Sequence, residues 1–231
     1  MASTFFGLHI GSSALSSFQV ATNTTANNIA NVKTTGYTRQ EATLQAKDAI
    51  NVTARYGSVG TGVTVTSIKQ QRDLYYDNKY WENNSCYGRY EQKLYYMEQI
   101  QNYFKDNGSS VKGFSSVFSQ MFSDLDTLRS KPSDKTVRNQ FISSAQSLCT
   151  YFNQMSDNLA KLQDDCNEES RNNVDKINSI SEKISLLNKE INQIETGTGV
   201  EASSLRDERA NLIDSLSKIV NVSYNETEVQ N

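Results

Sequence analysis

Apolar side chains recur at alternating three- and four-residue spacings along most of the chain, the period of one face of an α-helix. The first such row predicts a helix over residues 4–33, and its members are Leu8, Gly11, Leu15, Phe18, Thr22, Thr25, Ile29 and Val32. Because the row includes glycine and threonine, a helix with this sequence is marginal when isolated in water. We expect it to be disordered alone and to become ordered against partner helices. The alternative is a helix that packs on its own domain.

The period changes to two over residues 37–69, which predicts half-buried strands. Two alternating runs, residues 38–44 and 63–68, flank a glycine-rich stretch from Gly57 to Gly62. This stretch lacks the glycine spacing, the following helix and the lysine of a phosphate-binding loop, so it predicts a turn. We therefore expect a β-hairpin-like segment.

The helical period returns over residues 70–106, in a row formed by Tyr87, Tyr90, Leu94, Met97, Gln101 and Phe104. An aromatic cluster precedes this row and consists of Tyr75, Tyr76, Tyr80 and Trp81. Because basic residues are sparse around the cluster, it predicts packing in a core or between subunits rather than stacking on nucleic acid. Residues 107–110 predict a turn.

Two further helical patterns follow. The first is a short row of Phe114, Phe118, Met121, Leu125 and Leu128, which residues 131–134 bring to an end. The second runs from Val137 to Cys166 and resumes in a different phase from Ile177 to Ile194. The change of phase over residues 164–173 predicts a stutter, a bend or a short break there.

The last part of the chain predicts a helical hairpin that turns at residues 197–199. Ser204 and Asp207 have the spacing of a capping box, so we expect them to begin the last helix. We also expect Arg209 to pair with a carboxylate and fix the hairpin. After this helix an alternating run predicts the start of a strand, at Val220, Val222 and Tyr224.

The predicted fold is mainly α, an elongated long-helix bundle or coiled coil with a small β-rich segment after the N-terminal helix. The expected domains are 1–36, 37–70, 71–220 and 221–231.

A single proline among 231 residues favours long uninterrupted helices. The net charge of −3 gives no reason to expect nucleic-acid binding. The sequence contains no run of eighteen apolar residues, so it predicts no membrane span. The N-terminal residues lack the features of a cleaved signal peptide.

Candidate catalytic and metal-binding residues are few. His9 is the only histidine, and no G-x-S-x-G motif is present. The spacing of the three cysteines, Cys86, Cys149 and Cys166, forms no C-x-x-C pair. On one helix the last two would lie ~25 Å apart, too far for a disulfide. We predict no enzyme, no metal and no cofactor, and we interpret the cysteines as small buried side chains or inert surface thiols.

The junction between the first helix and the strands carries the most specific sequence. Gly36 is placed as the C′ residue of the helix, with Lys33 in the last turn. The surrounding string resembles the shared sequence of bacterial flagellar axial proteins, and its continuation after the glycine resembles the hook-associated members. The matching residues are Asn27, Asn28, Ile29, Ala30, Asn31, Gly36, Tyr37, Thr38, Arg39 and Gln40. A second match to the hook-associated members comprises Leu205, Asp207, Arg209, Leu212 and Leu216.

The resemblance implies a structural subunit of the hook–filament junction that polymerises through residues 1–36. The partner contacts are expected along the seam of Leu8, Leu15, Phe18, Ile29 and Val32. The implied partners are further copies in a ring, neighbouring hook and filament-side junction proteins, the flagellar export apparatus and a chaperone. Nucleic acid and membrane are not among them. The implied location is the extracellular flagellum, reached without a cleaved signal peptide.

Members of this family continue into a β-rich outer domain and into C-terminal helices that pack on the N-terminal ones. If residues 1–231 are the whole chain, the N-terminal seam lacks that partner. Two alternatives stay open: a rod- or hook-type axial protein, and a soluble coiled-coil adaptor or secreted effector without catalytic activity.

Overall fold

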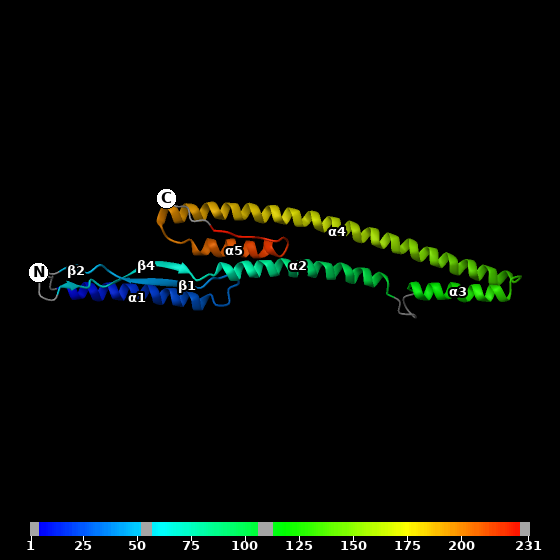
Figure 1. Ribbon diagram of the computed structural model, residues 1–231, viewed down its shortest axis with the longest axis horizontal. Helices are drawn as coiled ribbons and strands as arrows, with labels where there is room; N and C mark the ends of the chain where they lie inside the picture. Colours follow the sequence, from blue (N-terminus) through cyan, green and yellow to red (C-terminus); the bar gives the residue numbers. More distant parts are fainter. Residues whose placement is uncertain (1–4, 52–56, 106–112, 227–231) are drawn as a thin grey trace. The chain divides into compact units, whose positions relative to one another are not determined.

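The computed structural model describes residues 5–51, 57–105 and 113–226. The elements of this part of the chain are α1 (Phe6–Ala30), β1 (Gln40–Ala46), β2 (Ile50–Asn51), β3 (Ser58–Val59), β4 (Val63–Gln70), α2 (Leu74–Tyr103), α3 (Phe114–Ser130), α4 (Lys135–Thr198) and α5 (Ser203–Ser217) (Figure 1). The fold is mainly α, with small antiparallel sheets after the N-terminal helix, which confirms the predicted class. Helices make up most of the described residues, and α4 alone contains 64 residues.

The chain divides into two compact units. The first unit comprises residues 1–85 and 177–231, and the second comprises residues 86–176. The long helices α2 and α4 contribute residues to both units. No helix in the described ranges is long and apolar enough to cross a membrane.

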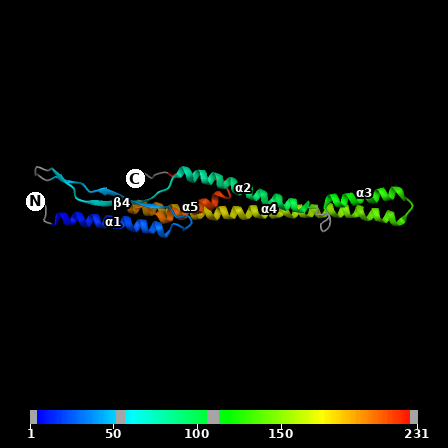
Figure 2. The ribbon, with the colours of Figure 1, turned by 90° about the horizontal axis from the view of Figure 1, so that it is seen from below.

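In the first unit, α1 lies along a ribbon formed by β1 and β4 (Figure 1, Figure 2). The buried side chains of α1 are small and polar, namely Ser17 and Thr24. The Ser17 hydroxyl donates a hydrogen bond to the carbonyl oxygen of Val63 at 3.1 Å. Gly62 of the ribbon also approaches the helix, because a Cβ on it would lie 2.2 Å from the Ser13 Oγ. Small residues therefore allow helix and ribbon to pack closely.

The ribbon is antiparallel and pairs Gln40 with Gln70 at one end and Ala46 with Val63 at the other. The pairing shifts between Thr43 and Leu44, which is a β-bulge. The prediction of two strands here is confirmed. The second pair, β2 with β3, was not predicted, because strands of two residues show no periodicity.

The end of α1 differs from the prediction. The helix ends at Ala30, so placing Lys33 in its last turn and Gly36 at its C′ position is wrong. After Asn31 the backbone N–H groups bond to carbonyl oxygens three residues earlier, Val32 to Ile29 at 3.4 Å and Thr34 to Asn31 at 2.9 Å, so the chain leaves the α-helical pattern. Gly36 does adopt the left-handed region, with φ of 79°, but at the end of the turn that follows the helix.

The core of the first unit is formed where α2 and α5 meet and where α4 lies beside α5 (Figure 1). Trp81 of α2 is only 2% exposed, and its Nε1–H donates to the Asp214 carboxylate at 2.6 Å. The Asn84 side chain donates to the Ser217 hydroxyl at 2.8 Å. The other buried apolar side chains of this core are Leu187, Ile191, Ala202, Ala210 and Ile213. Of the predicted aromatic cluster, Trp81 is therefore core, whereas Tyr75, Tyr76 and Tyr80 are exposed.

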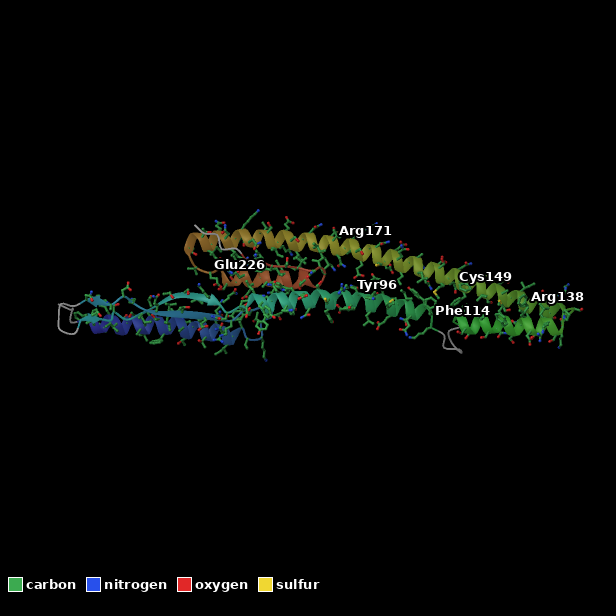
Figure 3. The ribbon with its side chains drawn as sticks, viewed as in Figure 1. Tyr96, Phe114, Arg138, Cys149, Arg171 and Glu226 are labelled. Atoms are coloured by element: carbon green, nitrogen blue, oxygen red, sulfur yellow. The ribbon has the colours of Figure 1, made fainter. Side chains whose placement is uncertain are left out.

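In the second unit, α3 packs on α4 through aromatic rings. The ring of Phe114, labelled at the start of α3 in Figure 3, lies 5.1 Å from that of Phe118 and 5.9 Å from that of Phe152. Met155 and Leu162 of α4 are buried. The helix α3 was predicted correctly. The predicted turn at residues 107–110 lies outside the described residues.

The change of phase over residues 164–173 does not interrupt α4, so a break there is wrong. Glu169, which would be the next seam residue if the row ending at Cys166 continued in the same phase, accepts hydrogen bonds from two side chains of α2. The Gln92 amide donates to it at 2.5 Å, and the Tyr96 hydroxyl donates to its other oxygen. A polar contact thus replaces an apolar one where the two rows meet.

The turn between α4 and α5 forms at Gly199, whose φ is 67°. The predicted capping box is wrong, because α5 begins at Ser203 with Ala202 as its N-cap and without a side-chain cap. The Ala202 N–H instead donates to the Glu195 carboxylate at 3.0 Å. Asp207, the expected partner in the box, forms hydrogen bonds elsewhere.

The strand predicted at residues 220–224 is also wrong, since the described residues after α5 contain no strand. The Tyr224 ring packs edge-on against Trp81 at a centroid distance of 5.7 Å. This contact holds the segment against the helices.

Candidate functional site

The site that the sequence singled out begins with Asn28, on the last turns of α1. Its Nδ2 donates to the Gln40 carbonyl oxygen at 2.8 Å, and its Oδ1 accepts from the Gln40 N–H at 3.0 Å. The Tyr37 hydroxyl donates to the same Oδ1 at 2.8 Å. The amide therefore pairs with Gln40 as a neighbouring strand would, and ties α1 to the first residue of β1.

The other asparagines of the motif extend this network. Asn27 Nδ2 donates to the Tyr37 hydroxyl oxygen at 3.1 Å. Asn31 Nδ2 donates to Asn27 Oδ1 at 3.0 Å, and the Thr34 hydroxyl donates to Asn31 Oδ1 at 3.2 Å. Each asparagine thus has a definite structural role in the turn after α1. The motif residues Ile29, Ala30 and Arg39 are exposed.

The turn docks on α5 through Asp207. The Thr38 N–H donates to Asp207 Oδ2 at 3.3 Å, and Gln70 Nε2 donates to Asp207 Oδ1 at 2.8 Å. Burial, together with the negative charge of Asp207, raises the pKa of Tyr37. The two sequence motifs, which are far apart along the chain, therefore meet at one carboxylate.

Gly36 makes the second contact with α5. A Cβ on Gly36 would lie 1.8 Å from the Asn211 Oδ1. Because Asn211 comes four residues after Asp207, the two side chains lie on the same face of α5. This face receives the turn that follows α1.

Arg209 of the second motif pairs with a carboxylate, as predicted. Its guanidinium lies 3.1 Å from the Glu226 carboxylate and donates to Asn188 Oδ1 at 3.0 Å. Figure 3 shows Glu226 beside α5. Arg209 also lies over the Tyr224 ring at 5.4 Å. The remaining motif members, Leu205, Leu212 and Leu216, are half-buried.

The sequence pattern does not identify Arg206, which forms the shortest ion pair of the hairpin. Its Nε and NH2 groups bond to the two Glu195 oxygens, at 2.6 and 2.8 Å. The hydrogen bonds from Arg206 hold the pKa of the Glu195 carboxyl below its usual range, against the opposing effect of burial. The predicted turn at residues 197–199 was the available signal, because a hairpin brings residues on its two sides together.

The apolar seam of α1 lies on a different face from the one that packs on the ribbon. All five predicted contact residues are exposed: Leu8 at 70%, Leu15 at 70%, Phe18 at 58% and Ile29 at 68% on α1, and Val32 at 76% in the turn after the helix. Near the end of the helix, Ile29 and Val32 line an open groove of about 620 Å³, together with Tyr37 and Arg39. The structure thus leaves the whole seam accessible.

A second exposed row lies on α2, in the second unit. Its members are Tyr87, Tyr90, Leu94, Met97 and Phe104, each more than half exposed. Tyr87, Tyr90, Leu94 and Met97 keep the predicted three- and four-residue spacing along one face of α2, and Phe104 follows directly after the end of the helix. An apolar face of this kind is typical of a surface that contacts another protein.

Groups able to perform chemistry are scattered. No cluster of three or more His, Cys, Asp or Glu side chains suited to a metal ion occurs among the described residues. His9 is exposed on α1. Cys149 and Cys166 are exposed, Cys86 is half-buried, and all three thiols are free. The features that stand out in this structure are surfaces for contact.

Comparison with known proteins identifies the family of this chain. The model of the flagellar hook-associated protein FlgK helical domain matches residues 97–231, and that of the flagella basal body rod protein matches residues 8–38. The flagellar hook-associated protein 1 of Bacillus subtilis (strain 168) is 34% identical over 98% of this chain. The proteins of that name from Salmonella typhimurium and Escherichia coli K12 are 33% and 31% identical, each over 91% of this chain.

The chain spans 46% of the length of the Bacillus relative, and 37% and 38% of the other two. The helical-domain model nevertheless covers more than half of the chain, through the second unit and into α5. The rod-protein match covers α1 and the turn after it. The chain therefore belongs to the flagellar hook-associated protein family.

Proposed function

We propose that this chain is a structural subunit of the bacterial flagellar hook–filament junction and that it assembles through α1 and the helical bundle. The observation that carries the proposal is the position of α1. One face of this helix packs on the chain's own ribbon, while the apolar seam on another face is open. A seam in this position is suited to contacts with neighbouring helices in a tube.

The energetics favour covering the seam. Complete burial of a large apolar side chain contributes roughly 1.5–3 kcal/mol. Leu8, Leu15, Phe18, Ile29 and Val32 are all more than half exposed. Several such side chains buried together offset the entropy lost when a marginal helix becomes fixed. We assign these five residues to contacts between subunits.

The two sequence motifs have a supporting role in this proposal. Residues 27–40 fix the exit of the chain from α1, and the motif at residues 205–216 provides the helix that receives it. The exposed row of α2 lies in the outer bundle, which we assign to contacts that adapt hook to filament. The domains follow as 1–36 for polymerisation, 37–70 for the ribbon, 71–220 for the bundle and 221–231 for the start of a further domain.

The proposed partners are further copies in a ring and the adjoining hook and filament-side junction proteins. Export through the flagellar apparatus with a chaperone, without a cleaved signal, would place the protein outside the cell. The function needs neither a cofactor nor catalysis. A rod- or hook-type protein is the nearest alternative, but the match over residues 97–231 favours the hook-associated members. A soluble adaptor or effector is the second alternative, and the matches to flagellar relatives weigh against it.

Seam variants in the source bacterium test the proposal. Leu15→Asp and Phe18→Asp place a charge on the seam, so they should abolish incorporation into sheared hook–filament preparations. Ser16→Asp is the matched control, because Ser16 is exposed and points about 100° away from Leu15 around the helix axis. Mass spectrometry should detect peptides of the parent chain and of the control in the preparations. Normal incorporation of both seam variants, or absence of the parent chain from complete flagella, would contradict the proposal.

A further inference from the structure

Asp207 links the ribbon to α5, and what we infer from this link rests on the proposed function and deepens it. Its two carboxylate oxygens accept hydrogen bonds from Thr38, just before β1, and from Gln70, the last residue of β4. Because Gln40 pairs with Gln70 in the ribbon, the carboxylate lies where both strands leave the sheet. We propose that Asp207 is a positioning residue that holds the ribbon on α5 and thereby fixes the direction in which the seam of α1 faces its partners.

The connection from Asp207 to the seam is continuous. Asp207 binds Thr38, the neighbouring residue Tyr37 bonds to Asn28, and Asn28 belongs to α1. The second route runs through Gln70, whose backbone N–H donates to the Glu201 carboxylate at 3.0 Å. Both strands are thus attached at this one end of the ribbon, to Asp207 of α5 and to Glu201 just before the helix. Displacement of the ribbon would carry α1 with it, since the helix packs on both strands.

The contact requires a carboxylate rather than any polar side chain. Gln70 Nε2 also donates to the Ser203 carbonyl oxygen at 2.9 Å, so the Gln70 amide is fixed as a donor toward Asp207. The Thr38 backbone N–H is always a donor. Two donors therefore face one side chain, and only an ionised carboxylate offers an acceptor oxygen to each. In Asp207→Asn, one of the two donors would face an NH2 group.

Asp207 is separate from the contacts that hold α5 in the core. Those contacts involve Trp81 with Asp214 and Asn84 with Ser217, further along the helix. Trp81 is the only tryptophan in the sequence, so its fluorescence reports specifically on the packing of α2 and α5. Loss of the Asp207 contact should loosen the ribbon on α5, with the bonds of Gln70 to Glu201 and Ser203 remaining, and should leave the Trp81 emission unchanged.

The test compares Asp207→Asn with Glu208→Gln in the full chain. Glu208 is exposed and undergoes the same change from carboxylate to amide. In Asp207→Asn, the Thr38 amide should exchange its hydrogen at least about tenfold faster, and incorporation into flagella should fall. Glu208→Gln should change neither. An unchanged exchange rate of Thr38 in Asp207→Asn, or an equal increase in Glu208→Gln, would overturn the inference.

Two further variants keep the result decisive. If Asp207→Asn alters the Trp81 emission, Gln70→Met removes a donor without changing α5, and the same readouts then decide. Faster exchange with normal incorporation would refute the positioning role. Leu15→Asp should abolish incorporation while Thr38 stays protected, so failure of the proposed function is distinguished from failure of the Asp207 contact.

Discussion

Gly36 and Asn211 approach so closely that a methyl group on Gly36 would overlap the Asn211 side-chain amide. A Cβ on Gly36 would lie 1.8 Å from Asn211 Oδ1 and 2.3 Å from its Cγ. The φ of Gly36 is 79°, in a region that other residues enter only at a cost. The backbone therefore favours glycine at this position, and any side chain there would also have to displace the Asn211 amide on α5.

We predict that Gly36→Ala lowers the free energy of unfolding of the first unit by about 1–3 kcal/mol, because strain in φ adds to the clash. Asn211→Ala removes the clashing atoms, so the double variant should recover part of this loss. Urea unfolding followed by Trp81 fluorescence measures both effects. Gly60→Ala is the control, since Gly60 has neither a positive φ nor a neighbour within 4 Å of the added Cβ. Equal losses in the single and double variants would show that the contact contributes nothing.

The ion pair of Arg206 and Glu195 predicts a dependence of stability on pH. The pKa of Glu195 is lowered in the folded state from its ordinary value of 4.5. A lowered pKa means that the pair stabilises the fold fully above about pH 4.5 and that this contribution is lost as the pH falls through the folded pKa. The side chains are 24% and 25% exposed, so the contribution at pH 7 is about 1 kcal/mol.

Glu195→Gln should therefore destabilise the first unit at pH 7, and do so less at a pH below the folded pKa of Glu195. Urea unfolding followed by Trp81 fluorescence at the two pH values measures the difference. Glu190→Gln is the control on the same helix, because Glu190 is exposed. A loss of the same size at both pH values would mean that the charge of Glu195 does not matter.

The hydrogen bond between Tyr96 and Glu169 predicts an unusual titration in the second unit. This bond, and to a lesser extent burial, raises the pKa of Tyr96 well above its ordinary value of 10.0. Tyr96 should therefore stay protonated at about pH 11 in the parent chain, and its pKa should fall toward the ordinary value in Glu169→Gln. A titration of ¹³C-labelled tyrosine followed by NMR measures this. Glu168→Gln is the matched control, since Glu168 is an exposed neighbour. Ionisation of Tyr96 at the same pH in the parent and in Glu169→Gln would contradict the assignment.

Periodicity predicted the helices and the two main strands well, because residues on one face of a helix or strand recur at its period, whether that face is exposed, as on α1, or partly buried, as on α4. It failed where side chains compete with the backbone. The helix α1 ends at Ala30, earlier than glycine and lysine suggested, in a turn held by asparagine side chains, and Asp207 bonds to the ribbon rather than capping α5. Such choices depend on groups that folding brings from distant parts of the chain.

In the candidate site, too, one part could be predicted from local spacing and another part could not. The seam of α1 could be predicted from spacing alone, and the structure shows it exposed. The meeting of the two motifs at Asp207 could not, because no local pattern records a contact between residues 38 and 207. The pair of Glu195 and Arg206 lies between these cases, since the predicted hairpin brought the two residues near each other without specifying their bonds.

The helix α1 should be unstable by itself. Within the helix, Thr22, Thr24 and Thr25 donate their hydroxyl hydrogens to carbonyl oxygens four residues earlier. Bonds of this kind slightly destabilise a helix, and Ser17 forms its hydrogen bond only with the ribbon. A peptide of residues 1–36 should therefore be largely unordered by far-UV circular dichroism. Replacing Gly11, Thr22 and Thr25 by alanine should raise its helicity, because together these changes favour the helix by about 2 kcal/mol. Strong helicity of the unmodified peptide in dilute buffer would show that α1 needs neither ribbon nor partner.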